Sequence, residues 1–152
     1  MNQNAIEITK KFIPREKQIE GNLVSVVPFT ARKGLNLQIR LVKVLGPAIK
    51  EVITPDVVSK IQSGDKDFTI SFDKIVSAFQ SVLSGPNSED LLALIVELMA
   101  NVTLNGQQMT ENNFDIVFVD NYTLMYQIAY FVVEVNFASL LKMGSIGSQP
   151  NQ

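Results

Sequence analysis

Hydrophobic residues recur at three- and four-residue steps through most of the chain, which is the spacing typical of amphipathic α-helices. The helical segments expected from this pattern cover residues 31–53, 55–61, 72–83, 88–99 and 121–141. Two earlier runs, 5–12 and 22–29, alternate imperfectly between apolar and polar residues and are rich in branched side chains, which predicts a β-hairpin. The expected fold class is therefore mainly α (α+β), a compact helical domain of about five helices with a short N-terminal β-hairpin.

The helix expected over 31–53 has an apolar face and a basic face. The apolar face, which we assign to the core, consists of Leu35, Ile39, Val42, Leu45, Ile49 and Val52. The other face carries Lys33, Asn36, Arg40, Lys43 and Lys50. Gly46-Pro47 should kink or divide the helix, because proline removes a backbone donor and clashes with the preceding turn. The basic face is either exposed to solvent or a docking surface for an acidic helix.

The helix expected over 88–99 should be the central buried one, because 91–99 is apolar on nearly every side. Ser88 is a suitable N-cap, and Glu89 and Asp90 follow in the first turn, where the helix dipole favours negative charge. Beyond this helix, Asn105-Gly106 lies between two short extended runs and predicts a small hairpin. An Asn-rich linker then leads to the last helix.

The last helix, expected over 121–141, contains a single charged residue, Glu134. Such a segment must be buried in a core, against a partner or in lipid. An ionised glutamate inside a bilayer costs about 2 to 4 kcal/mol and no basic flank precedes the segment, so a membrane span is disfavoured. A protein core accounts for Leu124, Ile128, Phe131, Val132 and Val135. The large residues left over, some of which should face a partner, are Tyr122, Met125, Tyr126, Tyr130, Phe137, Leu140 and Leu141.

Composition argues against most enzyme mechanisms. Cys and His are both absent, so the chain has no thiolate nucleophile, imidazole base, disulfide or zinc site of the usual ligand types. The nearest carboxylate pairs, Asp65/Asp67 and Glu89/Asp90, adjoin no plausible nucleophile and stand where loops and helix caps use acids routinely. We therefore expect a non-enzymatic protein with no catalytic residue, cofactor or metal.

The chain of 152 residues, 46% of them hydrophobic and 18% charged, is sufficient for one compact domain with its own core. We expect a single domain over 1–143, with the hairpin at about 5–29, followed by a flexible Gly/Ser tail over 144–152. The N-terminal residues have neither the basic nor the apolar region of a secretion signal, so we expect a cytoplasmic protein.

Charge is distributed unevenly along the chain. Residues 1–60 have a net charge of +5, and residues 61–152 have a net charge of −7. Such a charge dipole is either a clustering of solvated side chains or a means of orienting the molecule on a partner or on a copy of itself. The basic half has no interleaved aromatic residues and no Gly-rich phosphate loop, so nucleic-acid binding is not expected.

Two segments resemble the bacteriophage tail assembly chaperones. Phe29 to Pro47 (FTARKGLNLQIRLVKVLGP) is similar to the first helix of that family, where an aromatic residue leads into a Leu-rich basic helix ending in Leu-Gly-Pro. Tyr126 to Phe137 (YQIAYFVVEVNF) is similar to its closing helix. The family often continues with paired phenylalanines, where this chain has Leu140-Leu141. The resemblance extends over roughly residues 23–142.

This resemblance implies a protein that works in the host cell cytoplasm during tail assembly, binds the tape-measure protein and keeps it soluble while tube subunits polymerise around it. It would act as an oligomer or in several copies. The expected partner-binding residues are Lys33, Arg40, Lys43, Tyr126, Tyr130, Phe137, Leu140 and Leu141. An alternative is a permanent component of the tail tip or baseplate, retained in the virion tail, in which the basic and acidic halves of adjacent copies meet.

Overall fold

The computed structural model describes residues 12–52, 59, 63 and 71–141, with side chains for all of these except 49–52 and 139–141. The helices are α2 (Ala31–Val52), α4 (Phe72–Leu83), α5 (Ser88–Leu98), α6 (Glu111–Val117) and α7 (Tyr122–Leu141), with a 3₁₀ turn at Met99–Asn101. The strands are β1 (Arg15–Ile19), β2 (Asn22–Val26), β3 (Val102–Leu104) and β4 (Gln107–Gln108). The predicted class, mainly α with an N-terminal hairpin, is confirmed.

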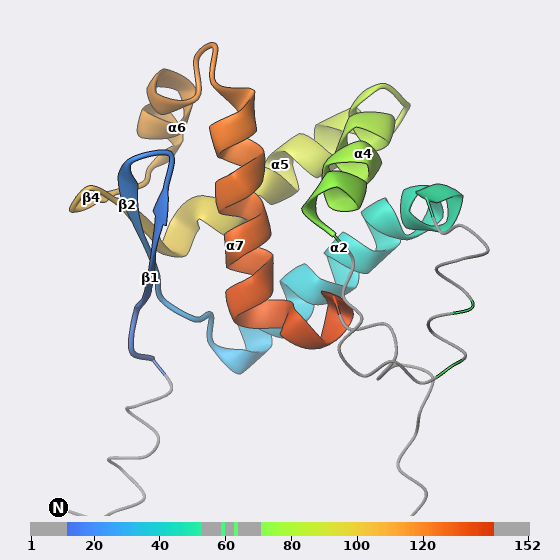
Figure 1. Ribbon diagram of the computed structural model, residues 1–152, viewed down its shortest axis with the longest axis horizontal. Helices are drawn as coiled ribbons and strands as arrows, with labels where there is room; N and C mark the ends of the chain where they lie inside the picture. The colour runs from blue at the N-terminus through green and yellow to red at the C-terminus, as the bar shows by residue number, and fades with distance from the viewer. Residues whose placement is uncertain (1–11, 53–58, 60–62, 64–70, 142–152) are drawn as a thin grey trace, which may run out of the picture.

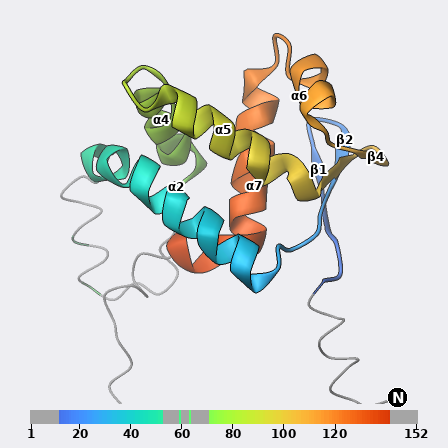
Figure 2. The same cartoon turned by 180° about the vertical axis from the view of Figure 1, so that it is seen from behind.

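Helix α7 lies between the sheet and the other long helices (Figures 1 and 2). On one side it contacts β1 and β2, and on the other it contacts α4 and α5, while α2 packs against both α4 and α5. The interior between these elements is filled by side chains that are almost completely removed from solvent. The largest of them are Phe79, Leu37, Leu91, Leu94, Ile95, Leu98, Met99, Ile128, Val24, Val26, Val102 and Val132. Helix α5 is the central buried helix that the sequence predicts, although Leu92 is exposed.

The four strands form one antiparallel sheet in the order β1-β2-β3-β4. Each hairpin turns through two residues with positive φ: Glu20-Gly21 (49° and 78°) in the first and Asn105-Gly106 (50° and 83°) in the second. The small hairpin predicted at Asn105-Gly106 is therefore confirmed. Pairing of β2 with β3 joins the two hairpins, so the N-terminal hairpin rests on the chain's own second hairpin as well as on α7.

The first strand of the predicted N-terminal hairpin was misplaced. It covers Arg15–Ile19, between the two runs from which we predicted the hairpin, whereas most of the predicted strand, residues 5–11, lies outside the described residues. Strand β1 is held by contacts that its own sequence does not reveal. The Lys17 ammonium is 3.8 Å from the Glu134 carboxylate and 5.5 Å from the centre of the Phe131 ring, so α7 stabilises a strand that is otherwise charged and exposed.

The face of α2 that we assigned to the core is mostly the wrong one. The buried row is Leu37, Leu41, Leu45 and Ala48, so only Leu45 belongs to both sets among the side chains that the structure describes. Leu35, Ile39 and Val42 are instead 58%, 59% and 49% exposed. Two apolar rows with the same helical spacing run along this helix, and periodicity alone does not distinguish the row that faces the core. The helix also continues through Pro47 without being divided.

Three further local expectations need correction. The N-cap of α5 is Asn87 rather than Ser88, and its side chain makes no capping hydrogen bond. The Asn-rich linker contains helix α6, whose start is capped by Thr110 accepting a hydrogen bond from the Asn113 N–H. In α7, Met125 and Phe137 belong to the core, although we had assigned them to the residues that the core leaves over.

The expected turn over 55–61 falls almost entirely outside the described residues, and so does the tail over 144–152. Within the described part of the chain, none of the helices combines the length and the apolar character that crossing a membrane requires.

Candidate partner-binding surfaces

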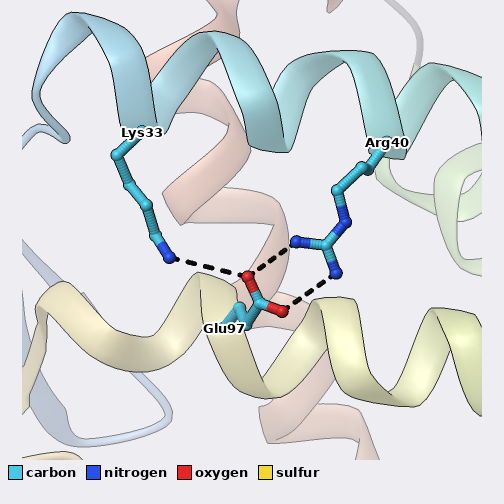
Figure 3. Close-up of polar contacts among 3 residues, drawn as sticks. All are labelled: Lys33, Arg40 and Glu97. Carbon is cyan, nitrogen blue, oxygen red and sulfur yellow. Dashed lines mark hydrogen bonds and ion pairs between the residues drawn. The ribbon is translucent and has the colours of Figure 1, made fainter.

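A charged cluster joins α2 to α5 (Figure 3). Two guanidinium nitrogens of Arg40 donate to the two carboxylate oxygens of Glu97, at 2.7 and 2.9 Å, and the Lys33 ammonium is 3.6 Å from the same carboxylate. The hydrogen bond from Arg40 lowers the pKa of the Glu97 carboxyl below its ordinary value of 4.5, with a smaller opposing effect of burial. Because all three side chains remain more than one third exposed, the Arg40–Glu97 pair contributes no more than about 1 kcal/mol to stability.

The charged cluster changes the interpretation of the basic face of α2. Lys33 and Arg40 already meet an acidic residue, and this residue belongs to the chain's own α5. Lys43 forms no ion pair with any described residue and borders a cleft of about 330 Å³ that Asp90 and Asn87 also line. Of the three basic residues that we expected to bind a partner, Lys43 is therefore the one whose charge remains available.

Leu35, Ile39 and Val42 form an exposed apolar row, which we call the α2 strip. These residues stand at positions i, i+4 and i+7, so they share one side of the helix. Arg32 and Lys43, both exposed, stand at one margin of the strip. An apolar row with basic neighbours on a helix is the type of surface that receives the apolar face of another helix.

A second apolar surface lies where α6 leads into α7. Here a groove of about 380 Å³ is lined mainly by Leu92, Phe114, Phe118, Val119, Tyr122 and Met125. Its floor is buried, and three residues at its rim are exposed: Leu92 (48%), Val119 (63%) and Tyr122 (61%). We call it the α6–α7 groove.

The aromatic residues that we expected to bind a partner make contacts within the chain. Tyr126 stacks on Phe79 with ring centroids 5.9 Å apart, and Tyr130 meets the edge of Phe72 at 5.6 Å. Burial raises the pKa of both tyrosine hydroxyls above the ordinary value of 10.0. Phe137 is only 4% exposed and lies near Gly34 of α2.

Of the eight expected residues, the six whose side chains the structure describes are divided between two helices. Lys33, Arg40 and Lys43 lie on α2, whereas Tyr126, Tyr130 and Phe137 lie on α7 and are wholly or partly buried. The side chains of Leu140 and Leu141 are outside the described part of the structure. Whether any of the eight binds a partner stays a prediction.

The α2 strip and Glu97 are the features that our assignment of sites missed. Glu97 is the only charge in the apolar run from Leu91 to Met99, which signals a cation on a neighbouring helix. Lys33 and Arg40, seven residues apart on one face, are suitable candidates for that cation. Placing this face against α5 would have turned Leu35 and Ile39 toward solvent.

Among the described residues, no three His, Cys, Asp or Glu side chains come together as a metal site. The described carboxylate pair Glu89/Asp90 lies in the first turn of α5, and Asp65 and Asp67 are outside the described residues.

The chain matches the model of a known protein family. The family model described as "Phage tail assembly chaperone protein, TAC" matches residues 20–147, which include both apolar surfaces, the charged cluster and most of the sheet. Searches among curated proteins and among solved structures gave no match.

Proposed function

The chain belongs to the phage tail assembly chaperone family, and from that premise we propose that it binds the tape-measure protein and keeps it soluble while tube subunits polymerise around it. The observation that carries this proposal is the α2 strip, because its three large apolar side chains are turned away from the protein's own core. A tape-measure protein that folds as a long amphipathic helix would present the complementary apolar face.

The strip is supported from behind, which favours binding without rearrangement. Leu37 and Leu41 anchor α2 in the core, and Arg40 fixes the helix to α5 through its paired hydrogen bonds to Glu97. A surface held rigid before binding avoids the entropy cost of ordering. Covering the exposed parts of the three strip residues is worth on the order of 3 kcal/mol, or about a hundredfold in affinity. A contribution of this size suits a client that must later be released.

Arg32 and Lys43 indicate which helices the strip would prefer. Both are exposed and lie on the same margin of the strip, so a client helix with acidic residues beside its apolar face would gain attraction and alignment. We place this binding in the host cytoplasm during assembly, with several copies of the chaperone distributed along one long client.

The test is co-expression of the chain with the tape-measure protein of the same phage. A Leu35→Ser/Ile39→Ser variant should fold as the parent does but leave the tape-measure protein in the insoluble fraction and lose about tenfold or more in affinity. The control is Ile116→Ser, which removes an apolar side chain of α6 that is even more exposed, at 74%. If the strip variant still keeps its client soluble and Ile116→Ser does not, the assignment to α2 is wrong.

Counting the chain in purified particles and in infected-cell lysate, by mass spectrometry, tests the chaperone role itself. Abundance in the lysate together with absence from particles supports transient action. A fixed copy number in particles would make the chain a lasting component of the tail tip or baseplate.

A further inference from the structure

The α6–α7 groove is lined by residues of four helices, α4, α5, α6 and α7, and of the connection between the last two. Phe114 and Phe118 of the α6 region pack edge to face, with ring centroids 5.0 Å apart, and form part of the floor with Met125 of α7. These three side chains are buried by the fold, so the floor is already formed in the isolated chain. The groove is therefore a fixed feature of the surface.

The rim of the groove is apolar where a surface would ordinarily be polar. Leu92 stands on α5, Val119 on the connection between α6 and α7, and Tyr122 at the start of α7. Three separate parts of the chain therefore present exposed apolar side chains around one groove. Exposed apolar residues gathered around a concave site are typical of binding surfaces, whereas isolated ones are common everywhere.

The charges of the groove are all of one sign. Asp115 lines it, and Asp120 stands between the rim residues Val119 and Tyr122. Glu89 precedes Leu92 by one helical turn on the same side of α5. From Ile75 to Leu141 the sequence contains no Lys or Arg, so α5, α6 and α7 carry no cation to balance these carboxylates. The one cation of α4, Lys74, stands at the opposite end of that helix from the lining residue Leu83.

We propose that the α6–α7 groove receives a basic amphipathic helix of a second partner protein, one that presents apolar side chains on one face and Lys or Arg beside them. The negative rim attracts and orients such a helix and disfavours one with acidic margins. The α2 strip should prefer a helix with acidic margins, since the charged residues beside it are Arg32 and Lys43. One copy of the chain can therefore hold two helices of opposite charge on two separate surfaces.

The test uses the full chain and three labelled synthetic helical peptides of equal length. The first has Leu at positions i, i+3, i+7 and i+10 with Lys on both margins, the second replaces Lys by Glu, and the third scrambles the first so that no apolar face remains. Fluorescence anisotropy at low salt should give at least tenfold tighter binding of the first peptide than of the other two. Equal binding of the scrambled peptide would reduce the effect to general charge attraction and overturn the proposal.

Variants then locate the site. Leu92→Ser should weaken binding of the lysine peptide about tenfold, and Asp115→Asn/Asp120→Asn should reduce both the affinity and its dependence on salt. Both changes fall on exposed side chains, and asparagine tolerates the positive φ of 55° at Asp120, so folding should persist. The control is Ile39→Ser in the α2 strip, which should leave this binding unchanged.

A direct readout comes from the methionine methyl groups. On addition of the lysine peptide, the methyl resonance of Met125 in the groove floor should shift, while that of Met109, which borders a different hollow, should stay in place. A shift of Met109 alone, or an increase in the chain's mass through self-association in the absence of peptide, would assign the groove to another occupant and refute the proposal.

Discussion

Helices α2 and α7 are both long and rich in apolar residues, yet they use their apolar surface differently. Helix α7 is covered by the sheet on one side and by α4 and α5 on the other, so most of its apolar residues are buried within the chain. Helix α2 is covered on one face only, and its second apolar row remains exposed. The number of neighbouring elements, more than apolar content, decides which helix has a face to offer a partner.

The largest effect should follow from removing a side chain that α7 buries. Ile128→Ala should lower the free energy of unfolding by about 2 to 5 kcal/mol, because Ile128 is fully buried and the cavity would be only partly refilled. Urea denaturation followed by circular dichroism measures the change. A loss below about 1 kcal/mol would mean that the side chains around Ile128 pack less tightly than the structure shows.

Breaking the charged cluster should have a smaller effect. Glu97→Gln should cost up to about 1 kcal/mol at pH 7, since Glu97 receives both hydrogen bonds of Arg40 on a partly exposed surface. Thermal unfolding at several pH values is the appropriate measurement.

The pH dependence of this effect has a defined sign. Because folding depresses the pKa of Glu97, its stabilisation is present above the ordinary value of 4.5 and is lost as pH falls below it through the folded-state pKa. The difference between the parent and Glu97→Gln should therefore shrink below about pH 4.5. Glu16→Gln, on the exposed strand β1, removes a carboxylate that forms no ion pair with a described residue and serves as the control.

Filling a space on α2 should stabilise the protein slightly. A Cβ added at Gly34 would lie 3.6 Å from Phe29 and 3.8 Å from Phe137, which are ordinary contact distances. Because alanine is also the better helix former, Gly34→Ala should raise the free energy of unfolding by about 0.5 to 1 kcal/mol. A destabilised variant would show that α2 and the end of α7 approach more closely than these distances indicate.

The smallest change in stability is expected at the α2 strip. Ile39→Ala should alter the free energy of unfolding by less than about 0.5 kcal/mol, because the side chain is mostly in solvent already. Leu41→Ala, two residues further along the same helix but buried, should cost several times more. Similar losses in the two variants, measured side by side in urea, would contradict the assignment of the exposed row.

Features set by neighbouring residues could be predicted from the sequence. The Asn105-Gly106 turn follows from the low cost of positive φ in these residue types, and the extent of α7 follows from its uninterrupted apolar run. Helix α6 had a local signal that we overlooked, because Thr110 is a good N-cap and Phe114 and Phe118 are one helical turn apart.

Features set by distant contacts could not be predicted in the same way. Strand β1 is rich in charge, and it is stabilised by Glu134 and Phe131, which are more than a hundred residues away along the chain. The exposed row of α2 depends on the position of Glu97 in another helix. Likewise, Phe137 resembles an interface anchor in the sequence, and its burial follows from the packing of α7 near Gly34.

The pairing of β2 with β3 has a consequence for the order in which the protein folds. The Leu23 N–H donates to the side-chain oxygen of Asn105, 82 residues later, so this part of the sheet closes only after the intervening helices have been synthesised. Contacts between such distant residues form slowly, because a long loop must first be closed. On the ribosome, the N-terminal hairpin therefore emerges early with one edge unpaired, and α7, which packs against the sheet, is synthesised later than every strand.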